Sequence, residues 1–231
     1  MKTAIGMFVL ATGVAGAQVT TFDNGTEGWS VSGRDNISQT GGNPGANMDV
    51  QVIDVFGADI RNNTPNYTGD FRNRGLMSFT VDIQIDSISF FGSEVPRDLV
   101  IELRNFDTDN WGGFASVWAP LGTLTSSNSA WTTYSADLDS SAFDLPSGWF
   151  GAGFEDPNTF EPILPPGVSV QDVLSGVDEI AFTTFVPGFF FGFTNFDMSV
   201  DNVGIIVPTP SAAVVLPLGA MLAKRRRRQC G

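Results

Sequence analysis

Histidine is absent from this 231-residue chain, and its only cysteine, Cys230, is the penultimate residue. These two absences exclude a Ser-His-Asp triad, a Cys-His pair, a histidine-ligated zinc site and an intramolecular disulfide. The chemistry that remains open to catalysis is a pair of carboxylates or a calcium-assisted scheme.

Lysine is absent from residues 18–207, which contain all 25 acidic residues of the chain and only six arginines. This segment is therefore more acidic than the whole chain, whose formal net charge is −13. An acidic surface repels nucleic acid and anionic lipid, so the sequence predicts neither as a partner. The acidity fits either solubility alone or the binding of divalent cations, and both interpretations stay open.

The N-terminus has the pattern of a secretory signal peptide. Lys2 precedes an apolar stretch over residues 4–14, and Ala15 and Ala17 supply the small residues of a cleavage site. We therefore expect residues 1–17 to direct export through the secretion translocon and to be removed.

The C-terminus carries a second targeting signal. An apolar run of 12 residues, 212–223, ends in Lys224 and a cluster of arginines. At about 1.5 Å per residue the run is roughly 18 Å long, which is short for a hydrocarbon core of about 30 Å. Cations resist crossing a bilayer, so the cluster predicts arrest and transient membrane association of residues 208–231. The residues expected to form this segment's motif and stop are Pro208, Thr209, Pro210, Arg225, Arg226, Arg227 and Arg228.

This three-part tail resembles the PEP-CTERM sorting tail of bacterial exosortase substrates, with Thr209 in the place where that family usually has glutamate. The resemblance implies cutting near Pro208 to Pro210 by an exosortase-type enzyme, and retention at the cell surface, envelope or extracellular matrix. A permanent anchor and a buried core helix are the alternatives.

Residues 18–207 read as one mostly β domain, long enough for a substantial core. Apolar and polar residues alternate over 79–86 and 99–104, as expected for strands with one buried face. Further strands are expected at 114–119, 131–138, 177–185 and 198–207, and one short helix is expected after Ser169, with Asp172 at its third position. The pattern predicts an all-β, antiparallel two-sheet sandwich of the jelly-roll type with one short helix.

The order of motifs is similar to galactose-binding-like carbohydrate modules and to laminin IV (laminin B) domains. The opening segment 22–29, with Phe22 and Trp29, is followed by the glycine-rich loop 41–45 and a closing strand at 200–205. In related modules an acid on the first strand and one on the last share a structural calcium. The resemblance therefore implies a Ca²⁺ site at Asp23 and Asp201, with Glu27 as a further ligand, whereas the alternative leaves these carboxylates as turn caps.

Aromatic side chains in loops are the candidate glycan platforms, because sugar C–H faces stack on rings while nearby amides and carboxylates bond the hydroxyls. Trp111 and Trp149 lie in expected loops, whereas core or edge packing is expected for Trp29, Trp118 and Trp131. The polar residues that could accompany the two platforms are Asn105, Asp107, Asp109 and Asn110.

Two other segments offer alternatives. Five phenylalanines between 189 and 196 cannot all face one side of a sheet, so this segment predicts either an adhesive patch or a strand covered on both faces. Three carboxylates over 155–161 could serve a glycosidase, but Pro157 and Pro162 favour a solvated loop. The sequence thus predicts an exported, non-catalytic sandwich that binds glycan or extracellular polysaccharide. A structural matrix protein is the first alternative, and a carboxylate glycosidase is the second.

Overall fold

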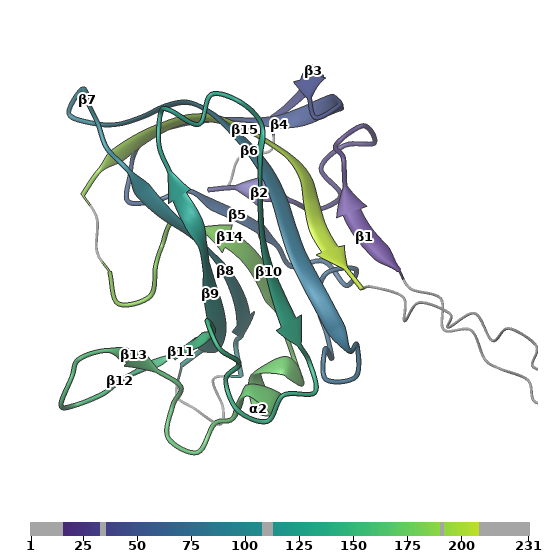
Figure 1. Ribbon diagram of the computed structural model, residues 1–231, viewed down its shortest axis with the longest axis vertical. Helices are drawn as coiled ribbons and strands as arrows, with labels where there is room; N and C mark the ends of the chain where they lie inside the picture. Colours follow the sequence, from purple (N-terminus) through teal and green to yellow (C-terminus); the bar gives the residue numbers. More distant parts are fainter. Residues whose placement is uncertain (1–15, 33–35, 108–112, 190–191, 208–231) are drawn as a thin grey trace, which may run out of the picture.

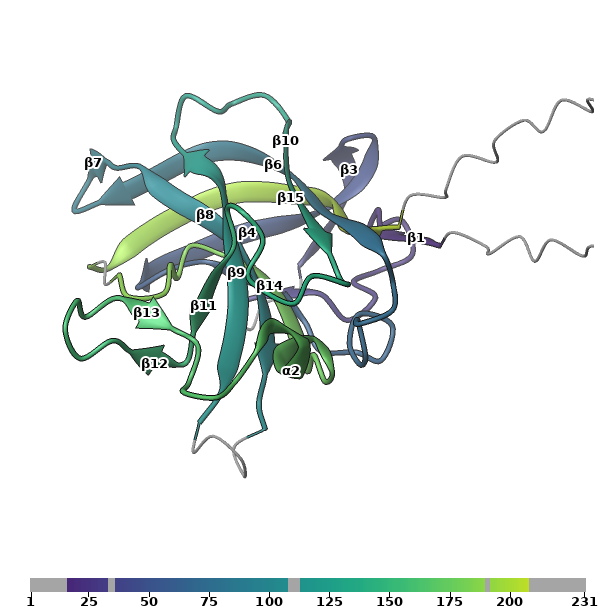
Figure 2. The same ribbon diagram turned by 60° about the horizontal axis from the view of Figure 1, so that its bottom comes forward.

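The computed structural model describes residues 16–32, 36–107, 113–189 and 192–207. The expected signal-peptide core, the sorting residues 208–231 and the platform residues Asp109, Asn110 and Trp111 lie outside this part of the chain. Two antiparallel sheets face each other across one apolar core (Figure 1; Figure 2). The expected mostly-β sandwich is thereby confirmed.

The first sheet has seven strands. Its order is β10-β6-β15-β4-β3, with β1 added to β15 and β7 to β6. The strands are β1 (Ala17–Thr20), β3 (Ile37–Gly42), β4 (Gly45–Val55), β6 (Leu76–Phe90), β7 (Ser93–Glu94), β10 (Thr132–Asp139) and β15 (Thr194–Ile206).

The second sheet has six strands in the order β11-β9-β8-β14-β5-β2. Its strands are β2 (Ser30–Val31), β5 (Asp59–Asn62), β8 (Arg97–Asn105), β9 (Ala115–Leu124), β11 (Phe150–Ala152) and β14 (Glu179–Thr183). A small hairpin of β12 (Phe154–Glu155) and β13 (Pro162–Ile163) projects beside β11 (Figure 2).

The core follows the period-two pattern of the strands. In β6 the side chains of Phe79, Val81 and Ile83 are fully buried between the sheets, and in β8 those of Leu99, Ile101 and Leu103 pack against them in the same cluster. Their neighbours on β8, at 100, 102 and 104, therefore point to the outer face of the six-stranded sheet. This outer face carries the candidate site.

The one described helix is α2 (Val170–Leu174), and its start is the capping box that the sequence predicts. The Ser169 side chain accepts a hydrogen bond from the Asp172 N–H, while the Asp172 carboxylate accepts one from the Ser169 N–H. Ser175 caps the other end. Of the described helices, none is long and apolar enough to cross a membrane.

Candidate functional site

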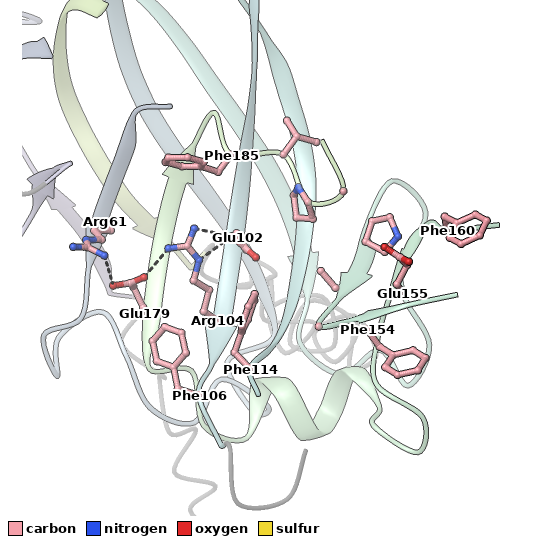
Figure 3. Close-up of a pocket in the computed structure, with 16 residues that line it drawn as sticks. Arg61, Glu102, Arg104, Phe106, Phe114, Phe154, Glu155, Phe160, Glu179 and Phe185 are labelled. Atoms are coloured by element: carbon pink, nitrogen blue, oxygen red, sulfur yellow. Dashed lines mark hydrogen bonds and ion pairs between the residues drawn. The ribbon is translucent and has the colours of Figure 1, made fainter. Parts of the chain in front are cut away.

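A groove of about 750 Å³ crosses the outer face of the six-stranded sheet. Strands β5, β8 and β14 supply its polar floor, while two loops and the β12–β13 hairpin supply its walls (Figure 3). Its side chains with functional chemistry are Arg61, Glu102, Arg104, Phe106, Phe114, Phe154, Glu155, Phe160, Glu179 and Phe185.

Strand register brings the floor together. Arg104 on β8 lies directly opposite Glu179 on β14 and opposite Ser116 on β9. Two residues earlier on β8, Glu102 lies between Ala181 on β14 and Trp118 on β9. Since successive strand residues alternate sides, Glu102, Arg104 and Glu179 all face the groove.

Arg104 is the centre of the floor and binds three carboxylates. Its Nη1 donates to Glu179 Oε1 at 2.7 Å, its Nε to Glu102 Oε2 at 2.8 Å and its Nη2 to Asp59 Oδ1 at 3.2 Å. Burial by itself lowers the pKa of the Arg104 guanidinium, but the Glu102 and Asp59 charges and the Glu179 hydrogen bond together raise that pKa above its ordinary value. The Arg104 guanidinium therefore stays charged, and its three partners hold it in place on the floor.

Two further contacts complete the network. The Ser116 hydroxyl donates to Glu102 Oε1 at 2.5 Å. Arg61 Nη1 lies 3.8 Å from both Asp59 Oδ2 and Glu179 Oε2, and 45% of its side chain is exposed. Arg61 is thus the floor cation that a ligand in the groove can reach, because Arg104 is nearly buried.

Phenylalanine rings form the walls. Phe106 and Phe114 lie at one end as an edge-to-face pair with their ring centroids 6.3 Å apart, and Phe185 lies across the floor from them (Figure 3). Phe154 and Phe160 come from the hairpin at the other side (Figure 3). All five rings are partly exposed, so the groove offers apolar faces next to hydrogen-bonding groups.

The hairpin is positioned by close packing at Gly153. Its φ is +121°, and an added Cβ would collide with the Phe114 carbonyl oxygen. Among the carboxylates of the expected acidic loop, Glu155 lines the groove. Asp156 instead accepts the N–H groups of Asn158 and Thr159, which lowers its pKa and commits it to the turn.

Two of the expected ligand residues have structural roles. Trp149 is only 5% exposed, and its Nε1 donates to the Asp137 carbonyl at 2.8 Å, so it is a core residue and not a platform. Asn105 is also buried, where its Nδ2 bonds the carbonyls of Asp172 and Val173 in α2. Asp107 is exposed but does not line the groove.

The three tryptophans for which core or edge packing was expected divide into two groups. Trp29 is buried in the core, and its ring contacts that of Tyr67 edge-to-face at a centroid distance of 4.9 Å. Trp118 and Trp131 are only partly buried, because Trp118 points outward from β9 and stacks on Phe150, while Trp131 Nε1 donates to the Gly41 carbonyl. Trp29 is therefore the core residue of the three, and the other two pack nearer the surface.

The expected calcium ligands each accept hydrogen bonds from the protein. Asp23 Oδ1 accepts the Ala46 N–H, and Asp201 accepts the N–H groups of Asn43 and Asn202. Glu27 instead accepts the Thr20 hydroxyl. No three histidine, cysteine or acidic side chains converge on a metal position within the described ranges. Calcium at Asp23, Glu27 and Asp201 therefore stays a prediction.

Asp201 is nonetheless an unusual carboxylate. Burial raises its pKa, the Asn43 and Asn202 N–H groups lower it, and the nearby charges of Asp82 and Asp23 raise it again, with a net increase. The Asp82 carboxylate on β6 accepts hydrogen bonds from the side-chain amides of Asn43 and Asn202. These bonds tie the turn at Asn43 and the β15 residue Asn202 to β6.

Sequence reasoning missed the groove. Glu102 and Arg104 belong to the expected strand at 99–104, which the structure confirms, but the alternation of residues does not show that the polar face of this strand forms the floor of a groove. The available signal was a carboxylate and a guanidinium at alternating positions of one strand. Its partners Asp59 and Glu179 lie tens of residues away, so only the strand pairing reveals the cluster.

Comparison with known proteins finds structural matches among solved structures. No family model matches the chain, and no curated protein matches it. An exo-β-agarase matches at 14% identity and a TM-score of 0.48, over 84% of this chain and 26% of that one. The CBM22-2 xylan-binding domain of Xyn10C from Paenibacillus barcinonensis matches at 14% identity and a TM-score of 0.43, over 83% and 99%.

The family 11 carbohydrate-binding module of the cellulase Lic26A-Cel5E from Clostridium thermocellum matches at 17% identity and a TM-score of 0.42, over 89% and 97%. A xylanase fragment from the same organism, Xyn10B, matches at 14% identity and a TM-score of 0.44, and the chain spans 28% of its length. At these identities and TM-scores the likenesses carry no weight for function.

Proposed function

We propose that the protein is a non-catalytic glycan-binding module that holds a neutral sugar chain in the groove. The observation that carries this proposal is the combination of partly exposed phenylalanine walls with a fixed polar floor in one hollow of about 750 Å³. Ring faces suit the C–H faces of sugars, and the floor offers donors and acceptors to hydroxyl groups.

The charge of the groove favours a neutral chain. Its floor and rim bring Asp59, Glu102, Glu179 and Glu155 together with only Arg61 and Arg104. The carboxylates therefore exceed the cations, and a polyanionic glycan would be repelled.

Binding is favoured over hydrolysis because the floor carboxylates are occupied. Glu102 accepts Ser116 with one oxygen and Arg104 with the other. Glu179 accepts Arg104 with one oxygen and lies next to Arg61 with the other. A glycosidase needs one carboxylate free to attack and one that holds a proton for the leaving group, and this pair is arranged for neither.

The two terminal segments complete the proposal. The leader pattern and the PEP-CTERM-like tail support export through the translocon, processing by an exosortase-type enzyme and retention at the surface or in the matrix. The test is immunogold labelling of intact cells, with the tail replaced from residue 208 as the comparison. Label confined to the cytoplasm in the unmodified protein would contradict this part.

Calorimetric titration tests whether the groove binds a glycan and which one. Xylo-oligosaccharides, agaro-oligosaccharides and cello-oligosaccharides form the neutral panel, and an acidic polysaccharide is the charged comparison. Phe114→Ala and Arg61→Ala should each weaken binding about fivefold, since each removes one wall or floor contact worth about 1 kcal/mol.

Matched controls exist outside the groove. Arg72 has the same 45% exposed side chain as Arg61 but pairs with Asp70, and Phe143 is highly exposed without lining the groove. Arg72→Ala and Phe143→Ala should bind like the unmodified protein. Equal losses in the controls, or no binding across the neutral panel, would favour a structural matrix protein, a role with which the burial of Trp149 also agrees.

A further inference from the structure

A second hollow lies on the seven-stranded sheet, and none of the described residues that line it also lines the groove. Its volume is about 500 Å³, and Asp54, Phe91, Phe193 and Asn195 line it. We call it the aromatic cup. It sits at the β7 end of the seven-stranded sheet, where β15 begins, whereas both chain ends leave near the other end of β15 (Figure 1; Figure 2).

Three strand ends supply the cup. Asn195 faces outward from β15 because Thr194 and Phe196 on either side of it are buried. Phe91 lies in the turn between β6 and β7, and its φ of +48° places it outside the extended backbone of β6. Asp54 has a φ of +55° near the end of β4, where the register against β15 shifts.

The rings of the cup are exposed but supported. Phe91 is 88% exposed and packs edge-to-face on Phe90 at 4.5 Å. Phe193 is 50% exposed, and Phe56 packs on it at 4.6 Å. Each lining ring thus has a second ring behind it, which holds its position without covering it.

A carboxylate stands beside these rings. The Asp54 backbone N–H donates to Asn195 Oδ1 at 2.9 Å, which fixes the segment that carries the carboxylate. Among the described residues, nothing makes a hydrogen bond or an ion pair with the Asp54 carboxylate itself. Arg97 approaches β15 nearby, but its Nη2 donates to Thr194 Oγ1, a buried atom on the core side of the strand.

We infer that the aromatic cup binds a small organic cation, specifically a methylated ammonium group. Ring faces attract a cation through their quadrupole, and an adjacent carboxylate adds a direct charge interaction. A methylated ammonium suits the site better than a bare ammonium because its methyl groups also pack against the rings. The inference is independent of the glycan proposal, since the two hollows have different linings among the residues that the structure describes.

The test compares two ligands of the same shape with different charges. Choline and its uncharged carbon analogue 3,3-dimethylbutan-1-ol are titrated into the full-length protein at fixed ionic strength, with saturation-transfer NMR on the methyl signals and calorimetry. Choline should bind saturably, and the alcohol at least several-fold more weakly. Equal binding of the two ligands, or no saturable choline signal, overturns the inference.

Two substitutions identify the site. Asp54→Asn keeps the shape and the positive φ that asparagine tolerates, and Phe193→Leu keeps an apolar side chain without a ring face. Each should weaken choline binding about two- to fivefold, the range for one exposed cation–π or ion-pair contact. Asp144→Asn and Phe143→Leu are controls on one exposed loop that does not line the cup, and they should leave binding unchanged. Losses as large in the controls would contradict the assignment.

The same ammonium group could come from a free metabolite or from a lipid headgroup. Sedimentation with phosphatidylcholine vesicles and with phosphatidylglycerol vesicles separates the two sources. Retention only on phosphatidylcholine, lost in Asp54→Asn, supports a headgroup, and choline binding without retention supports a soluble ligand. Retention on both vesicles that persists in Asp54→Asn shows a purely apolar surface and overturns the inference.

Discussion

At the scale of single residues, Arg104 holds the groove together by pairing with three carboxylates. Removing one partner of a buried charge cluster leaves the others uncompensated, so Arg104→Met should lower the free energy of unfolding by about 3 to 5 kcal/mol. Denaturant unfolding measures this loss. The exposed Arg72–Asp70 pair is the comparison, and Arg72→Met should change stability far less, because solvent screens an exposed ion pair. Similar losses in both variants would contradict a special role for Arg104.

Asp70 offers a second measurement at this scale. The Arg72 side chain and backbone N–H both donate to its carboxylate, which lowers its pKa from 3.8 to about 2. A carboxyl NMR titration should show this value in the unmodified protein. In Arg72→Ala, the pKa should return toward 3.8. An unchanged pKa in the variant would mean that the contact is not formed in solution.

Asp201 gives a prediction with a sign. Its folded-state pKa is raised, so the folded protein binds more protons than the unfolded chain as the pH falls toward 3.8. The ionised Asp201 carboxylate therefore reduces the stability of the folded protein most near neutral pH, where the group carries its full charge. The stability of the unmodified protein relative to Asp201→Asn should therefore increase from pH 7 to pH 4, as measured by urea unfolding. A relative stability that decreases as the pH is lowered from 7 to 4 would show the opposite shift of the pKa.

At the scale of elements, the addition of β1 to the seven-stranded sheet depends on Gly204. Val19 lies opposite Gly204, and a Cβ there would collide with the Gln18 carbonyl and come within 2.7 Å of Val19 Cα. Gly204→Ala should therefore detach β1 or strain the pair, lowering stability by about 1 to 3 kcal/mol. Faster amide exchange at 18–20 would locate the effect. Gly113→Ala, which has open space, is the matched control.

The elements also show what sequence patterns reach and what they miss. β6, β8 and α2 were predictable because alternation and a capping box are local signals. The residues of the groove were not, because Arg104 meets Asp59 and Glu179 only through the pairing of β8, β14 and β5. Trp149 misled for a related reason, since a loop position says nothing about the strand that its indole reaches.

At the scale of the whole molecule, the groove and the aromatic cup lie on different sheets. Two ligands can therefore bind at the same time, provided that both proposals hold. Saturating the groove with its glycan should leave the affinity for choline unchanged within error in a sequential titration. A tenfold change would indicate coupling of about 1.4 kcal/mol and would require a shared conformational change.

The pairing of Ala17 with Ile206 has a consequence for engineering. The first and last strands of the described domain run side by side in opposite directions, so the chain enters and leaves at one point on one edge. Such a unit could be spliced into a surface loop of a carrier protein as a cassette, with short joints and little distortion of the host. The groove would then face outward on the guest, ready to give its host an affinity that the host lacks.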